Sequence, residues 1–293
     1  MSVNIYNNVS SNKQRTALLL IVFLLIIISL GWIFSRLYET PIILYVAVII
    51  SLFQALIGYY SGDRVALALS GAREINKDDN PDLFRVVENL AITAGLPMPR
   101  LFIITDASPN AFATGRDPEH ASIAVTTGLL DILDKPELEG VIAHELSHVG
   151  NYDIRLMTVV VVLVSVVALL SDIFLRVNYF FGRSDDRNSG NFTFILALIA
   201  AILAPIVATL IQFAISRKRE FLADASGVML TRYPDGLANA LNKISAYNRP
   251  MRRVSSATSH LFISNPQGKT KSFFSNLFST HPPVEDRIKA LLG

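Results

Sequence analysis

His144-Glu145-Leu146-Ser147-His148 is the stretch around which the rest of the chain is organised. Residues four apart lie on one face of a helix, so His144 and His148 can present two imidazoles to one metal ion. Glu145 lies beside the first histidine, where its carboxylate can reach a water molecule rather than the ion. Imidazole nitrogen suits zinc, and a catalytic zinc site keeps one position open for water. The stretch therefore predicts a zinc site; the alternative is a helix with two ordinary exposed histidines.

Composition is typical of a membrane protein. Apolar residues make up 51% of the 293 residues and charged residues only 17%, and the apolar residues are gathered in long blocks. The net charge is +2, and no basic stripe is interleaved with aromatic residues, so nucleic acid is not expected as a partner. The chain has no cysteine, so disulfides are excluded and a metal site must use histidines and carboxylates.

Four apolar blocks predict four transmembrane helices. The first, 16–34, is long enough to cross a bilayer of about 30 Å, and it lacks the small-residue cleavage site of a signal peptide. A short turn separates it from the second block, 41–60, which predicts an antiparallel hairpin. The third and fourth blocks cover 155–177 and 192–215, and a polar loop over 178–191 joins them.

Basic residues predict the orientation of these spans. Lys13 and Arg15 precede the first block, and Arg217-Lys218-Arg219 follow the fourth. Because the segments on the cytoplasmic side carry an excess of Lys and Arg, both termini, including residues 1–15, are expected in the cytoplasm. The loop 178–191 is then expected in the periplasm.

Two segments of mixed composition, 61–154 and 216–293, are expected to meet on the cytoplasmic side as one protease domain. The first should hold a helix that begins near Asn80, a helix from Pro136 that carries the two histidines, and three strands. The expected strands are 101–104, 110–115 and 122–126, and a further helix is expected over 235–247 in the second segment.

Two histidines leave zinc one protein ligand short. Glu220 is the expected third ligand, because it follows the fourth block on the same side of the membrane, and two histidines with a glutamate are a known catalytic zinc set. Asp224 shares a helix face with Glu220 and is expected to hold a ligand histidine by its second nitrogen, with Asp153 as the rival for this role. The alternative is a helix with ordinary surface carboxylates.

These groups predict hydrolysis of a peptide bond. Zinc lowers the pKa of water and polarises a carbonyl, while Glu145 takes the proton and passes it to the leaving nitrogen. His281 is a candidate for stabilising the oxyanion, with a surface histidine before a proline turn as the alternative. His120, at a turn, and His260, in a polar loop, are expected to be exposed to solvent.

With these residues in view, the chain resembles the HtpX family of bacterial membrane zinc metalloproteases and, more distantly, the CAAX prenyl proteases. The resemblance rests on the four spans, both ligand segments, the Asn110-Ala111-Phe112 strand, and Ser279-Thr280-His281-Pro282-Pro283 followed by Arg287-Ile288. It implies that Asn110, Ala111 and Phe112 lie beside the active site and pair with extended substrate. It also favours His281 as an active-site group.

The resemblance implies a mainly α membrane protein, with four transmembrane helices and a cytoplasmic α+β zincin-like protease domain that contains a small sheet. One Zn²⁺ per chain is expected, in an endopeptidase of the bacterial cytoplasmic (inner) membrane. Its substrates would be misfolded or surplus membrane proteins and unfolded polypeptides, in quality control and the stress response. A functional link to other quality-control proteases of the membrane is a further implication.

Three other functions stay open. The first is a zinc peptidase with a narrow substrate, such as a prenylated or signal-derived peptide. The small number of predicted spans, four, argues against it. The second is a metal-dependent membrane scaffold without activity, and the third is a protease buried in the bilayer, which polar residues around 140–154 and 216–224 oppose. Residues 251–276 are expected to be mobile or irregular, and part of 251–278 is hypothesised to cover the cleft.

Overall fold

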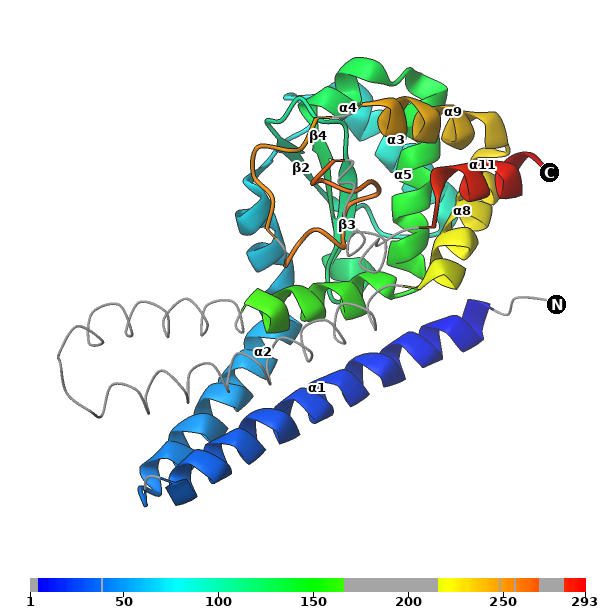
Figure 1. Cartoon of the computed structure of the whole chain (residues 1–293). Coiled ribbons are helices and arrows are strands. Elements are labelled where there is room, and N and C mark those ends of the chain that lie inside the picture. The colour runs from blue at the N-terminus through cyan, green and yellow to red at the C-terminus, as the bar shows by residue number, and fades with distance from the viewer. Residues whose placement is uncertain (1–4, 38, 166–215, 248, 256, 269–281) are drawn as a thin grey trace.

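The structure is a computed structural model that describes residues 5–37, 39–165, 216–247, 249–255, 257–268 and 282–293. Two long helices, α1 (Ile5–Leu37) and α2 (Ile42–Ser70), form a hairpin whose connecting turn points away from the compact part of the described chain (Figure 1). The helices approach closely at Gly31, where an added Cβ would lie 2.4 Å from the Cβ of Ala47. Small residues of this kind let membrane helices pack backbone to backbone.

Both helices of the hairpin are long and apolar enough to cross a membrane. Many of their apolar side chains face outward; Leu25 is 59% exposed, Ile49 66% and Phe53 63%. An apolar surface of this extent indicates a lipid or protein environment rather than water. Each helix is longer than its predicted span, because the helical backbone continues past the apolar block into polar residues.

The third predicted span is described only where it begins. Residues 153–165 are helical and pack against α2 at Gly62, where an added Cβ would lie 2.6 Å from Thr158. The remainder of that span, the loop 178–191 and the fourth span 192–215 lie outside the described residues.

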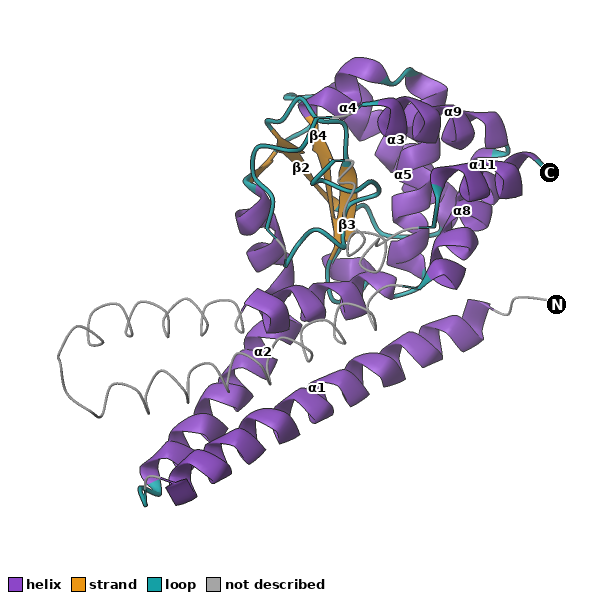
Figure 2. Cartoon of the chain, in the orientation of Figure 1, coloured by secondary structure: helices purple, strands orange, loops and turns teal. Residues whose placement is uncertain are grey.

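A small mixed sheet forms the centre of the compact part (Figure 2). Its strands are β1 (Ala72–Glu74), β2 (Arg100–Ile104), β3 (Ala111–Thr114) and β4 (Ser122–Thr126), in the order β1-β2-β4-β3. The β2–β4 pair is parallel and the other two pairs are antiparallel. The three predicted strands are confirmed, whereas β1 was not predicted because it is short and largely exposed. Strand β3 lies at an edge of the sheet.

Helices surround this sheet, and the helices predicted near Asn80, from Pro136 and over 235–247 are confirmed. The surrounding helices are α3 (Pro81–Ala94), the 3₁₀ turn η1 (Pro118–His120), α4 (Thr127–Ile132), α5 (Lys135–Gly150), α8 (Arg217–Thr231), α9 (Pro234–Ala246) and α11 (Val284–Leu292). Helix α5 begins with a reciprocal capping box between Asp134 and Glu137. It packs against α9 so closely that a Cβ on Gly140 would lie 2.6 Å from the backbone nitrogen of Leu237.

The described part of the segment 249–268 is irregular, as predicted, but it is folded into the protein. The prediction for His260 is wrong: its side chain is buried, and Nε2 lies 3.1 Å from the carbonyl oxygen of Met157. The apolar run Leu261-Phe262-Ile263 draws this part of the chain into the core, against the polar average of the loop. His120 is exposed, as predicted.

Candidate metal centre

Two helices from distant parts of the sequence build the site. Helix α5 presents His144 and His148 on one face, with ring centroids 4.7 Å apart. Helix α8 crosses α5 at Gly227, where an added Cβ would lie 3.0 Å from the backbone nitrogen of His144. Glu220, Asp224 and Gly227 share one face of α8 because their spacing is four and then three residues. Close approach at Gly227 therefore brings both carboxylates to the histidines.

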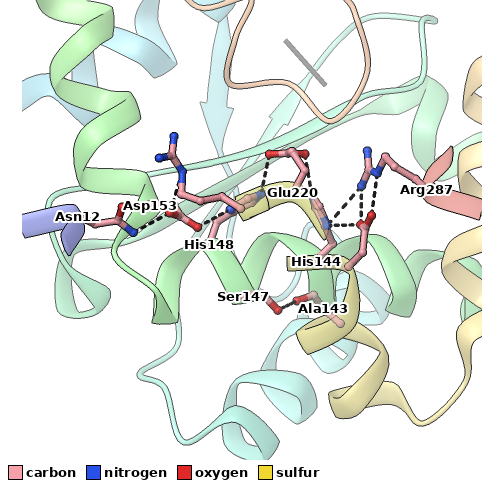
Figure 3. Close-up of polar contacts among 10 residues, drawn as sticks. Asn12, Ala143, His144, Ser147, His148, Asp153, Glu220 and Arg287 are labelled. Atoms are coloured by element: carbon pink, nitrogen blue, oxygen red, sulfur yellow. Dashed lines mark hydrogen bonds and ion pairs between the residues drawn. The ribbon is translucent and has the colours of Figure 1, made fainter. Parts of the chain in front are cut away.

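His144, His148 and Glu220 form a buried group in which one ligand atom from each lies within 4.8 Å of the others. Glu220 lies between the two rings (Figure 3), 3.9 Å from Nε2 of His144 and 3.6 Å from Nε2 of His148. The two Nε2 atoms are 3.2 Å apart. The structure thus brings together the three residues predicted as metal ligands.

The outer nitrogen of each histidine contacts its own carboxylate. Nδ1 of His144 lies 2.9 Å from Asp224, and Nδ1 of His148 lies 3.0 Å from Asp153. An ionised carboxylate only accepts hydrogen bonds, so each Nδ1 carries the hydrogen and each Nε2 directs its lone pair inward. Two lone pairs and the Glu220 carboxylate then converge in a buried space, which is the donor set of a divalent metal such as zinc.

Arg287 is a member of the site that the sequence did not predict. Its guanidinium, on α11, is fully buried and binds Asp224 with two contacts, Nη2–Oδ1 at 2.6 Å and Nε–Oδ2 at 2.9 Å. Burial alone would raise the pKa of Asp224, but the hydrogen bonds from Arg287 and His144 outweigh it and lower this pKa to about 2. Asp224 therefore stays ionised and keeps accepting from His144.

The second histidine has a shifted pKa for related reasons. Burial alone would lower the pKa of His148, but the hydrogen bond to Asp153 and the charges of Glu220, Asp153 and Glu145 raise it to about 9 without metal. A proton on Nε2 of His148 reduces the repulsion between the lone pairs that converge there. A metal ion at the same place would displace that proton.

The other predicted site residues have different surroundings. Glu145 is buried, on the helix that carries both histidines, and His281 lies outside the described residues. Asn110 and Phe112 are buried on or beside β3; the amide of Asn110 donates to the Ser264 carbonyl oxygen at 2.9 Å. Their side chains are thus part of the core, and only backbone groups of β3 are placed to meet a ligand at the sheet edge.

A helix that carries two histidines, a carboxylate from a later helix and a mixed sheet beside them define a zincin-like metallopeptidase, here joined to two helices with the length and apolarity of membrane spans. Residues 77–293 match the model of peptidase family M48. The chain belongs to peptidase family M48 and to its HtpX group.

Relatives cover nearly the whole chain. Over 288 residues, 49% are identical to the "Protease HtpX homolog" of Tropheryma whipplei (strain Twist), a match that covers 98% of this chain and 97% of the relative. The "Protease HtpX homolog" of Dictyoglomus thermophilum is 45% identical over 287 residues, a match that covers 98% of this chain and 93% of the relative. The crystal structure of S. mikatae Ste24p aligns with 17% identity and a TM-score of 0.49, over 94% of this chain and 63% of that one.

Proposed function

We propose that this metalloprotease is a zinc endopeptidase that cleaves misfolded or surplus membrane proteins at the cytoplasmic face of the bacterial inner membrane. The observation that carries the proposal is the buried group of His144, His148 and Glu220, with each histidine held by its own carboxylate. A merely structural cluster would not need Glu145 next to it, buried and on the same helix.

Each residue has a proposed task. His144, His148 and Glu220 hold the zinc ion, which when bound supplies Lewis acidity and lowers the pKa of water. Glu145 accepts the proton of the attacking water and donates it to the leaving nitrogen. Asp224 and Asp153 fix the tautomers of the histidines, as outer partners of ligand histidines do. His281 remains the candidate donor to the oxyanion.

Strand β3 is the proposed substrate platform. Asn110 and Thr126 form a hydrogen-bonded pair between β3 and β4, so alternation directs the N–H and C=O groups of Ala111 and Ala113 to the open edge. An extended polypeptide can add there as a further strand with little sequence selectivity, which suits a quality-control enzyme. The Ala111 carbonyl already accepts from the N–H of Ile263 at 2.9 Å, so a substrate that extends this far would displace that segment.

Membrane placement is part of the proposal. Four spans, both termini in the cytoplasm and a periplasmic loop at 178–191 would put the protease segments 61–154 and 216–293 on one side. The contact between α5 and α8 supports this arrangement, because these helices belong to different segments. The polar start of α1 lies against the site through Asn12, which supports a centre just outside the membrane.

Replacing Glu145 by Gln tests the chemistry. We expect purified Glu145→Gln in detergent to retain one zinc per chain while casein cleavage falls by about 10²- to 10⁴-fold, because the variant keeps the ligands and loses the base. Glu139→Gln, a half-buried glutamate on the same helix, is the matched control and should cleave normally. Equal cleavage by Glu145→Gln and wild type would remove Glu145 as the base, and a wild-type chain that binds zinc without cleaving anything would favour the scaffold.

A further inference from the structure

Asn12 is a polar side chain that is buried near the start of a helix otherwise suited to a membrane. It is 3% exposed, although its neighbours Lys13, Gln14 and Arg15 are exposed. Its Nδ2 donates to Oδ1 of Asp153 at 2.7 Å and to the carbonyl oxygen of Asn151 at 3.0 Å. Both hydrogens of one amide are therefore used on a segment about 140 residues away in the sequence.

The segment that Asn12 contacts is the break between α5 and the next helix. Asn151 follows the last turn of α5, and Tyr152 has a left-handed backbone with φ +60°, an uncommon conformation for a residue other than glycine. This reversal turns Asp153 back toward His148, whose Nδ1 it holds at 3.0 Å. Lys13 lies over the Tyr152 ring, 4.3 Å from its centroid, so α1 covers the break with two successive residues.

We propose that Asn12 is a positioning residue for His148 and acts through Asp153. Figure 3 shows the chain of contacts from Asn12 to Asp153 and on to His148. The inference rests on the proposed role of His148 as a metal ligand. It adds that α1, which precedes the matched family region 77–293, helps to build the metal centre.

The arrangement of donors around Asp153 explains why an amide is useful here. Oδ1 receives both Asn12 and Nε of Arg219, the latter at 3.2 Å, while Oδ2 faces His148. With Asn12 present, the carboxylate is fixed from the side of α1 as well as from α8. Without it, the carboxylate is free to rotate toward Arg219, and the His148 ring loses a fixed partner.

Metal release from the full chain in detergent tests the proposal. Zinc-loaded Asn12→Ala is mixed with excess chelator, and the rate of zinc loss is compared with wild type. We expect release to be about 3- to 10-fold faster. This effect is smaller than the roughly 10- to 100-fold loss of metal affinity that is typical when a direct partner of a ligand is removed. Two controls on α1 should release zinc at the wild-type rate: exposed Gln14→Ala, and buried Thr16→Val, whose hydroxyl bonds only within the helix among the described contacts.

A double-mutant cycle separates positioning from general packing. If Asn12 acts through Asp153, Asn12→Ala should have no further effect on zinc release in an Asp153→Ala background. The cobalt-substituted Asn12→Ala protein should also show a shifted visible spectrum, which loose packing of α1 alone would not produce. Asn12→Asp, which preserves the shape and places a second carboxylate beside Asp153, should release zinc faster than Asn12→Ala and serves if the alanine variant does not fold.

Three results would overturn the inference. Wild-type release rates in both Asn12 variants would remove any role at the metal. An effect of Asn12→Ala that persists undiminished without Asp153, or that Thr16→Val reproduces, would show that α1 acts by packing. A wild-type chain that binds no zinc would overturn the proposed function as well, whereas the first two results leave that function intact.

Discussion

At the scale of single residues, the metal centre depends on which nitrogen of each histidine carries a hydrogen. Asp224 and Asp153 fix the hydrogens on the outer nitrogens, and Arg287 keeps Asp224 ionised. A buried arginine that lost its carboxylate, or the reverse, would leave an uncompensated charge. Arg287, Asp224 and His144 therefore form one unit, in which Asp224 links the guanidinium to the imidazole.

The pKa of His148 predicts how the metal-free protein responds to pH. The folded value of about 9 lies above the ordinary 6.5, so His148 contributes stability that is fully present below pH 6.5 and is lost as pH rises through 9. We expect the thermal midpoint of metal-free protein to fall between pH 6.5 and 9, and the fall to be smaller in His148→Gln. A wild-type midpoint that is flat or rises over this window would contradict the assignment.

The grouping of His144, His148 and Glu220 could be predicted from sequence, but part of the contacts that support it could not. His144 and His148 share a helix face by spacing alone, and Glu220 followed from the expected sidedness of its segment. Arg287 belongs to a motif that the sequence singled out without a role, and only the packing of α11 gives it one. Asn12 had no signal beyond being polar beside an apolar block. Such long-range contacts have no period or spacing by which to find them.

At the scale of elements, the crossing of α5 and α8 decides whether the ligands meet. Gly227 lies one turn beyond Asp224 on the same face and allows the backbones to touch at His144. The neighbours of an added Cβ are backbone atoms of α5, which cannot move aside as a flexible side chain can. Glycine at this position therefore serves the metal centre, although its spacing from Glu220 gave no sign of this.

A bulkier residue at position 227 should separate the two helices. We expect Gly227→Val to lower zinc affinity by at least about tenfold, because Glu220 and Asp224 move away from the histidines together. Ala225→Val adds a similar bulk on the exposed face of α8 and should bind zinc like wild type. Competition with a chromogenic chelator measures both affinities, and equal values would show that the helix crossing does not control the site.

The elements themselves were largely predictable. Asn80, Pro136 and the apolar runs marked the helices and strands correctly, because capping and periodicity are local. Strand β1 was too short to give a pattern. The polar composition of the segment around His260 predicts an exposed side chain, but the run Leu261-Phe262-Ile263 packs in the core and buries it.

At the scale of the whole molecule, the proposed metal site can form only if both protease segments lie on one side of the membrane. The chain has no cysteine, so a single introduced thiol reports its own side. In intact cells, a thiol reagent that does not cross the inner membrane should label Ser184→Cys, in the predicted periplasmic loop 178–191, and leave Asp78→Cys unlabelled until the cells are opened. Labelling of Asp78→Cys in intact cells would place the protease domain outside the cytoplasm.

The most direct test of the central claim is the zinc content of the purified chain. We predict one zinc per chain in wild type and in Glu285→Ala, which removes an exposed carboxylate from α11. His144→Ala and Glu220→Ala should each lose most of the zinc and the proteolytic activity with it. Full zinc occupancy in Glu220→Ala would contradict the account, because the ion would then be held without the carboxylate that joins the two segments.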